Sequence, residues 1–353
     1  LKQLYLIYPL LIGIFLMSSC FLSNAAEIPS DNVDDKFLTN IEFESKLVSK
    51  WFNYYTKNGR KRFQRHLNRG EKYRTLIESI LISHELPIEL YYLGLIESGY
   101  VLEAKSHQSA VGPWQFIKST GKNYGLRIDS QIDERQNIYM ATHAAAKYLS
   151  DLHNIFNSWA LSIAAYNAGE YRIMNAIRKG KTRSFNELIK KNLLPDETKN
   201  YVSKFWTAMM LDRYSYEFKF SKKENVKKLD HLNLKIKLVK NYKLSKLLKL
   251  SGMTKEDFFS YNQHIKTKLI KATKNRPVTL YLPQTRFVQF AKNLDGKKPS
   301  KLVKVKDPQV LKKFGFKNLN SGEKLQMTKL SKGRVRIKRL KNGQTIDIFP
   351  PKI

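Results

Sequence analysis

A series of helical hydrophobic patterns across residues 72–220 is the strongest constraint on how this chain folds. The clearest pattern lies in residues 138–156, whose apolar residues fall on one helical face: positions 138, 141, 145, 149, 152 and 156. Residues 159–166 repeat the spacing, and residues 198–216 form another amphipathic stretch. No part of this region alternates as a half-buried strand would, so the pattern predicts an all-α domain.

Glu97 is an acidic residue on an apolar helical face. Residues 87–96 are predicted to be helical, and Leu90, Leu93 and Glu97 follow the i, i+3, i+7 spacing of one face. Burial disfavours the charged form of a carboxyl group and raises its pKa. A carboxyl that stays protonated near neutral pH can serve as a general acid that cleaves a glycosidic bond. The same pattern also fits a buried glutamate paired with an arginine, because ion pairs perturb carboxylates too.

Three further motifs follow Glu97-Ser98 in the chain. They are SAVGPWQF at 109–116, AAYNAG at 164–169 and ETKNYV at 197–202. In order and spacing the four motifs resemble those of soluble-lytic-transglycosylase-type domains, and in particular the membrane-bound lytic murein transglycosylase D type. The resemblance covers roughly residues 76–218, and it favours the catalytic interpretation of Glu97 over the structural one.

The resemblance implies a lysozyme-like fold and a glycan substrate of alternating N-acetylmuramic acid and N-acetylglucosamine. Glu97 would protonate the oxygen leaving C1 of the muramic acid. As a carboxylate it would then take the proton of the same sugar's C6 hydroxyl, which closes a 1,6-anhydro ring. The substrate's acetamido group would stabilise the positive charge, so one carboxyl can suffice. Three other acids are candidates for an inverting base, although their polar surroundings more simply predict a loop and helix cap: Asp129, Asp133 and Glu134.

The resemblance also implies substrate-binding roles for five residues. Ser98 would hydrogen-bond Glu97 or the acetamido group, and the amide of Gln115 offers both a donor and an acceptor. Tyr166 and Asn167 would line the cleft opposite Glu97, and Tyr201 would complete it from the last helix. Each has a structural alternative: Asn167 could cap a helix end, and Tyr201 could be a core residue.

The first 26 residues are predicted to be an export leader. One early lysine precedes an apolar run that is shorter than a typical transmembrane helix. Residues 17–20, Met-Ser-Ser-Cys, resemble a lipobox that would place a lipid on Cys20, whereas residues 23–25, Ser-Asn-Ala, fit ordinary signal cleavage. We favour the lipoprotein, partly because type D enzymes are commonly lipoproteins. Either way the protein is predicted to be exported to the periplasmic side of a bacterial envelope.

Cysteine and histidine usage limits the cofactor chemistry. Cys20 is the only cysteine, which excludes an intrachain disulfide and a cysteine-based zinc site. The seven histidines show no metal-ligand spacing. We therefore predict neither a metal nor another cofactor.

The hydrophobic pattern of the chain changes after residue 232, from helical spacing alone to a mixture of strand and helix patterns. Residues 234–239 and 278–283 alternate as strands, and residues 244–259 look helical. Residues 244–262 resemble the LysM-like module that follows the catalytic domain in type D enzymes, which implies a small α+β wall-binding unit. Residues 286–353 contain two segments typical of closing strands, at 321–326 and 342–348, and are predicted to be a degenerate module or a basic tail.

The prediction is thus a mainly α protein: a lysozyme-like catalytic domain followed by an α+β LysM-like module and a basic tail. Its five parts are a leader (1–26), a linker and helical segment (27–71), the lytic transglycosylase domain (72–220), the module (232–285) and the basic region (286–353).

Positive charge is concentrated in the C-terminal part of the chain. The net charge is +34, and residues 221–353 hold 35 Lys/Arg against 8 Asp/Glu. Such a block suggests an anionic envelope polymer as a partner, or simply a solvated, lysine-rich surface. A nucleic-acid partner is not expected, because the leader predicts export and no aromatic residues interleave with the charges as base-stacking motifs. The remaining alternatives are a muramidase of the same fold and a non-catalytic wall-binding protein.

Overall fold

The structure is a computed structural model, and it describes residues 45–221, 229, 233–283, 285, 286, 290, 325–329, 335–339 and 345–348. The predicted leader, Cys20 with its predicted lipid, and the acidic linker up to residue 44 lie outside the described residues. Most of the predicted basic region lies outside them as well.

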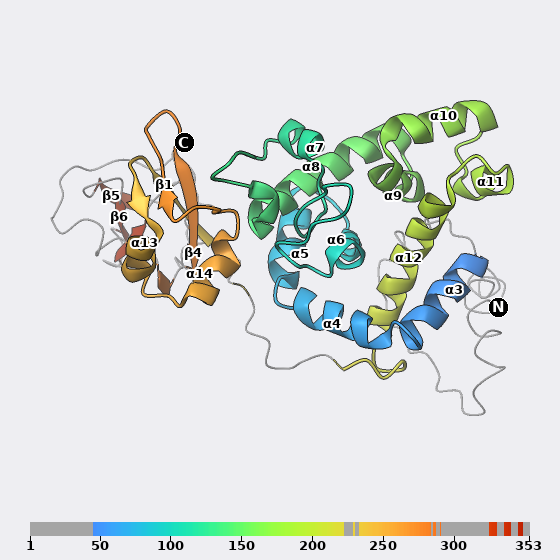
Figure 1. Cartoon of the computed structure of the whole chain (residues 1–353), viewed down its shortest axis with the longest axis horizontal. Coiled ribbons are helices and arrows are strands. Elements are labelled where there is room, and N and C mark those ends of the chain that lie inside the picture. Colours follow the sequence, from blue (N-terminus) through green and yellow to red (C-terminus); the bar gives the residue numbers. More distant parts are fainter. Residues whose placement is uncertain are drawn as a thin grey trace. The chain divides into compact units, whose positions relative to one another are not determined.

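The described chain is mainly α-helical, as predicted (Figure 1). In the segment 27–71, predicted to be a linker and helical, the described residues from 45 onward hold α3 and α4. The helical elements of the N-terminal part are α3 (Ser45–Thr56), α4 (Arg60–Gly70), α5 (Arg74–Ser83), η1 (Ile88–Leu90), α6 (Tyr91–Ser98), α7 (Lys118–Asn123), η2 (Glu134–Gln136), α8 (Ile138–Phe156), α9 (Trp159–Ala168), α10 (Glu170–Gly180), α11 (Phe185–Lys190) and α12 (Asp196–Arg213).

The helix ends follow from local sequence. Asn137 and Ser158 cap α8 and α9, because their side-chain oxygens accept hydrogen bonds from Met140 N and Leu161 N. No strand forms among residues 72–220 beyond isolated bridges, which confirms the all-α prediction for that region. One boundary differs, because residues 88–90 form a 3-10 turn before α6 begins at Tyr91.

The long helix α12 runs through the helical part and packs against α3, α6 and α9. Its Asp212 is 2% exposed and lies at the centre of a buried polar network. Arg74 forms an ion pair with this carboxylate, and the Tyr92 hydroxyl donates to it at 2.8 Å. The network joins α5, α6 and α12, and so fixes the helix that carries Glu97 relative to the helix that carries Tyr201.

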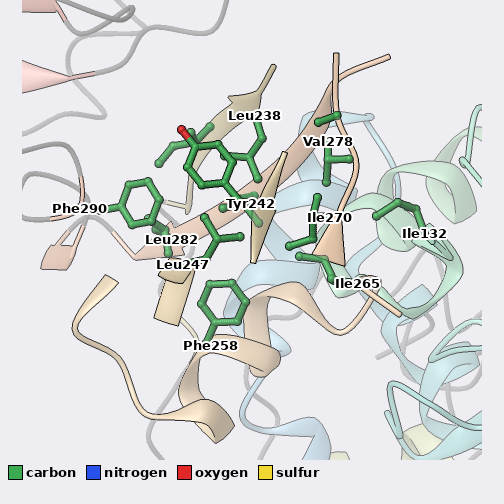
Figure 2. Packing of buried hydrophobic residues seen from close by; sticks show 13 residues of the cluster. Ile132, Leu238, Tyr242, Leu247, Phe258, Ile265, Ile270, Val278, Leu282 and Phe290 are labelled. Carbon is green, nitrogen blue, oxygen red and sulfur yellow. The ribbon is translucent and has the colours of Figure 1, made fainter. Parts of the chain in front are cut away.

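A small α+β unit follows, and its β1 and β4 form an antiparallel pair with Ile236 opposite Leu280. Residues 244–259, predicted to be helical, belong to two helices, because Gly252 is left-handed (φ +61°) and Thr254 caps a second helix. The unit's apolar residues form one cluster (Figure 2). Its elements are β1 (Asn233–Leu238), β2 (Tyr242–Lys243), α13 (Leu244–Ser251), α14 (Lys255–Asn262), β3 (Leu269–Ile270) and β4 (Val278–Pro283).

Among the described residues of the region predicted to be a degenerate module or basic tail, three strands form. They are β5 (Leu325–Lys329), β6 (Val335–Arg339) and β7 (Thr345–Ile348), and they pair antiparallel in that order. β5 and β7 overlap the two segments expected to be closing strands.

No helix in the described part of the chain combines the length and the apolar character needed to cross a membrane.

Candidate active site

Glu97 lies at the C-terminal end of α6, where the helix leaves the core. Gly99 caps the helix in the left-handed conformation (φ +57°), and its N–H bonds Leu95 O at 3.0 Å. A Cβ on Gly99 would lie 2.4 Å from the ring of His66, so a side chain does not fit there. The apolar residues before Glu97 are buried, and the exit at Gly99 leaves its carboxyl at the edge of the core.

The carboxyl of Glu97 accepts a short hydrogen bond from the hydroxyl of Tyr201, with 2.6 Å between Oη and Oε1. The Glu97 side chain keeps some access to solvent, but protein atoms surround its carboxyl closely. This burial raises the pKa of Glu97, and the nearby charge of Glu197 acts in the same direction. The Tyr201 hydrogen bond and the charge of Lys204 oppose the rise without cancelling it.

Lys204 is a neighbour of Glu97 that sequence reasoning missed. Its Nζ donates to Ile96 O at 2.9 Å and lies 5.5 Å from the centre of the Trp51 ring. Burial lowers the pKa of Lys204, and the negative charge of Glu97 counteracts that effect. The available signal was its spacing, because Lys204 follows Tyr201 by three positions and so shares its helical face.

The segment 104–116 is hydrogen-bonded to the helix that carries Glu97 and to the helix that carries Tyr166. Ser98 Oγ donates to Pro113 O at 2.9 Å, and not to Glu97 as one of the expectations had it. Tyr166 Oη donates to Trp114 O at 2.7 Å. The amide of Gln115 donates within its own loop, to Gly112 O at 2.7 Å and to Ala104 O at 3.4 Å, and its backbone is left-handed (φ +49°). Together these bonds tie the loop to α6 and α9.

Asn167 connects α9 with α12. Its Oδ1 accepts a hydrogen bond from Thr198 Oγ1 at 3.1 Å. The C-cap residue of α9 is Gly169, so Asn167 does not cap the end of this helix. Burial raises the pKa values of both Tyr166 and Tyr201 well above that of a free tyrosine. Both phenols therefore remain protonated and can act as donors throughout the physiological range.

The predicted site residues thus come from four separate segments that the fold links by hydrogen bonds. Glu97 and Tyr201 are in direct contact, while Ser98, Gln115 and Tyr166 meet through the loop, and Asn167 is anchored to the helix of Tyr201. All six except Tyr201 are half-buried, which leaves them access to a ligand from solvent.

The three alternative acids have structural partners. Asp133 caps η2 and pairs with Arg135 at 2.8 Å, and Asp129 pairs with Arg127 at 2.7 Å. Glu134 accepts a hydrogen bond from Arg127 N at 2.7 Å. These contacts agree with the loop-and-cap interpretation. Among the described residues, no group of three or more His, Cys, Asp or Glu is placed to hold a metal ion.

Comparison with known proteins supports one family for this part of the chain. Residues 77–189 match the family model of the transglycosylase SLT domain. The chain is 39% identical over 137 residues to membrane-bound lytic murein transglycosylase D of Escherichia coli K12, an alignment that covers 38% of this chain and 30% of that protein. It is 42% identical over 97 residues to peptidoglycan transglycosylase gp16 of Escherichia phage T7, covering 26% of this chain and 7% of the phage protein.

Among solved structures, the 70 kDa soluble lytic transglycosylase of Escherichia coli aligns with a TM-score of 0.36 and 21% identity. That alignment covers 41% of this chain and 24% of the other. The chain therefore spans less than a third of the E. coli relatives' own lengths.

Proposed function

We propose that this chain, which carries a transglycosylase SLT domain at residues 77–189, is a peptidoglycan lytic transglycosylase that cleaves the β-1,4 bond between N-acetylmuramic acid and N-acetylglucosamine. The observation that carries the proposal is the carboxyl of Glu97, whose pKa is raised by burial while Tyr201 donates to it. A raised pKa favours the protonated form, which must act first as the acid, and the hydrogen bond from Tyr201 stabilises the carboxylate, which must then act as the base.

The proposed reaction needs one proton and no water. Protonated Glu97 gives its proton to the glycosidic oxygen as the bond to C1 of the muramic acid breaks. The acetamido group of that sugar stabilises the positive charge at C1. The C6 hydroxyl oxygen of the same sugar then bonds C1, and its proton returns to the Glu97 carboxylate. The products are a 1,6-anhydro end and a free 4-hydroxyl on the leaving sugar, and the enzyme is regenerated.

Tyr201 and Lys204 would balance the two protonation states of Glu97. The phenol of Tyr201 donates to the carboxylate form of Glu97 and so stabilises the base that is produced in the first step. The buried ammonium of Lys204, held on Ile96 O, favours the same form through its charge. Burial of Glu97 favours the protonated form instead, and this effect keeps the acid form accessible.

The half-buried polar residues would bind the sugars. Ser98, Gln115, Tyr166 and Asn167 are proposed to contact acetamido and hydroxyl groups, because hydrogen bonds link their segments to the helices that carry Glu97 and Tyr201. In the structure the Gln115 amide donates to its own loop, so we propose that substrate binding exchanges these bonds for bonds to sugar.

The test is mass spectrometry of muropeptides released from purified sacculi by the protein and by Glu97→Gln. We expect 1,6-anhydro ends from the wild type and none from Glu97→Gln. Reducing ends would instead identify a muramidase. Absence of any release, together with retained binding to sacculi, would point to a non-catalytic wall-binding protein and would refute the proposal.

The other parts of the chain are proposed to bring this domain to the cell wall. We propose the division predicted from the sequence, with the catalytic domain at 72–220, a LysM-like wall-binding unit at 232–285 and a basic region at 286–353 that binds anionic envelope polymers. We also propose a lipid anchor on Cys20 that holds the exported protein at the periplasmic side of the envelope. Labelling of the expressed protein with a radioactive fatty acid, beside Cys20→Ser, tests the anchor.

A further inference from the structure

The α+β unit, residues 233–283, packs on the segment 127–137, which leads from α7 into α8. Ile132 and Ile265 form an antiparallel bridge between them, and Ile132, 1% exposed, belongs to the unit's apolar cluster (Figure 2). Backbone hydrogen bonds flank the bridge: Asp133 N to His264 O at 2.9 Å, and Lys266 N to Gln131 O at 2.8 Å. A shared core and backbone pairing distinguish this contact from that of a flexibly tethered module.

Asn137 joins the two surfaces with its side chain. Its Oδ1 caps α8, while its Nδ2 donates to Tyr261 O at 2.8 Å and faces Nδ1 of His264 at 3.0 Å. Nε2 of His264 lies 2.9 Å from Thr279 O and serves as its donor, which leaves Nδ1 as an acceptor. Burial lowers the pKa of His264 to about 4, in keeping with this neutral form. Further polar bonds cross the contact: Lys266 Nζ to Gln136 Oε1 at 2.7 Å, Arg276 Nη2 to Asp129 Oδ2 at 2.8 Å, and Arg127 Nη1 to Pro277 O at 3.0 Å.

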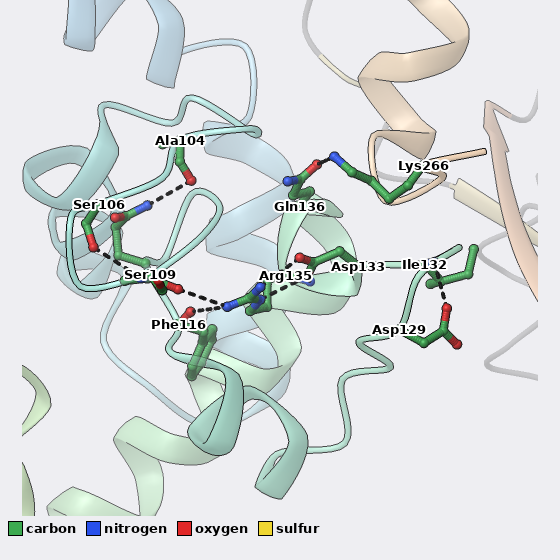
Figure 3. A network of polar contacts seen from close by, with 12 residues as sticks. Ala104, Ser106, Ser109, Phe116, Asp129, Ile132, Asp133, Arg135, Gln136 and Lys266 are labelled. Atoms are coloured by element: carbon green, nitrogen blue, oxygen red, sulfur yellow. Dashed lines mark hydrogen bonds and ion pairs between the residues drawn. The ribbon is translucent and has the colours of Figure 1, made fainter. Parts of the chain in front are cut away.

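Arg135 connects this contact to the loop that carries Gln115 (Figure 3). Asp133, whose N–H bonds the α+β unit, holds the guanidinium with both carboxylate oxygens, at 2.9 and 2.8 Å. Nη1 of Arg135 then donates to Ser109 O at 3.3 Å, in the middle of the loop, and to Phe116 O at 3.1 Å, at its C-terminal end. Arg135 is 7% exposed, so these bonds are shielded from water.

We propose that the α+β unit is an intramolecular positioning element for the loop 104–116, and that Arg135 is the positioning residue through which it acts. The unit fixes the backbone around Asp133, and Asp133 holds Nε and Nη2 of the guanidinium of Arg135. Nη1 is thereby aimed at Ser109 O and Phe116 O, on either side of Gln115. The inference rests on the proposed function for the sugar-binding role of this loop. Because the contacts of Arg135 are with the loop and not with Glu97, its effect falls on substrate affinity and not on proton transfer.

The kinetic test uses the full chain and a soluble tetrasaccharide of N-acetylglucosamine and N-acetylmuramic acid, so that binding to intact wall does not contribute. Arg135→Lys keeps the charge but removes the fork. Asn137→Asp keeps an oxygen that caps α8 and removes the donor to the α+β unit. Lys246→Gln, on the exposed face of α13, is the matched control.

We expect KM to rise about tenfold for Arg135→Lys, which corresponds to the loss of roughly one hydrogen bond. For Asn137→Asp we expect a rise of about threefold, because that variant weakens the loop only in part. The alkaline limb of the pH profile, which reports Glu97, should not move, and Lys246→Gln should match the wild type. A drop in kcat with an unchanged KM, or a shifted limb, would overturn the proposal.

Amide hydrogen exchange over residues 109–116 tests the same coupling without catalysis. Exchange of Val111 N, bonded to Phe116 O at 3.0 Å, should quicken in both Arg135→Lys and Asn137→Asp but not in the control. If the wild type released no product, the proposed function would fail while this measurement still decided the coupling. Wild-type exchange in Asn137→Asp, with the bond to Tyr261 lost, would refute the inference.

Discussion

Removing the hydroxyl of Tyr201 should shift the pH range in which Glu97 can act as an acid. Tyr201→Phe keeps the ring that packs in the core and deletes only the donor, 2.6 Å from Glu97 Oε1. A hydrogen bond to a charged group contributes about 1.5–3 kcal/mol. Since about 1.4 kcal/mol corresponds to one pH unit, the midpoint of the titration should move by roughly 1–2 units.

The direction of the shift follows from which form the hydroxyl stabilises. Tyr201 donates to the carboxylate, so its loss disfavours the charged form and raises the pKa of Glu97 further. Cleavage begins with the protonated acid, and activity falls as pH rises through this pKa. The alkaline limb of kcat/KM should therefore move to higher pH in Tyr201→Phe.

The assay is the pH dependence of kcat/KM on the soluble tetrasaccharide, which reports the pKa values of the free enzyme. The matched control is Tyr166→Phe, because the hydroxyl of Tyr166 donates to Trp114 O and not to Glu97. We expect Tyr166→Phe to change the height of the profile but not the position of its alkaline limb. An unmoved limb in Tyr201→Phe, or one at lower pH, would refute the assignment of Glu97 as the acid.

Three further predictions concern stability. Asp212→Ala leaves the charge of Arg74 buried without this partner, so the free energy of unfolding in urea should fall by about 3–5 kcal/mol. Glu78→Gln, which removes the more exposed partner of Arg74, should lower it by less than about 1 kcal/mol. Equal losses in the two variants would contradict this prediction. Gly125→Ala, at φ +86° with open space around it, should cost about 1–3 kcal/mol. Gly112→Ala should cost clearly more in the same assay, because its Cβ would also lie 1.9 Å from Arg135 O. Burial raises the pKa of Glu97 above its unfolded value, so its stability contribution is full at low pH and is lost as pH rises through the folded pKa. Glu97→Gln should therefore unfold at a higher temperature than the wild type at pH 8 and at a similar one near pH 4, and the opposite trend would show that the carboxyl is not buried.

Much of the helical framework could be predicted from the sequence because the signals are local. The apolar spacing of residues 138–156 gave the bounds of α8. For residues 244–259 the helical character was predicted but not the break between two helices, because apolar spacing continues across Gly252 although the backbone turns there. A hydrophobic pattern records which residues are buried, but it does not record where a left-handed residue interrupts the helix.

The identity of the acid could also be predicted, since Glu97 interrupts an apolar face and lies in one of four ordered motifs. The partners of the site residues could not be. Ser98 bonds Pro113 O in place of Glu97, and Lys204 reaches Ile96 O from a helix more than 100 positions away in sequence. Hydrogen bonds of this kind depend on how helices cross, and local spacing carries no information about that.

The sequence by itself therefore determined the mainly α framework, the candidate acid and the order of the motifs, because each depends on residues close together in the chain. Only the tertiary structure decided the setting of that acid and the place of the α+β unit. The contact of Ile132 with Ile265, and the reach of Arg135 to Ser109 and Phe116, join segments whose pairing is fixed by packing and by the need to satisfy buried polar groups.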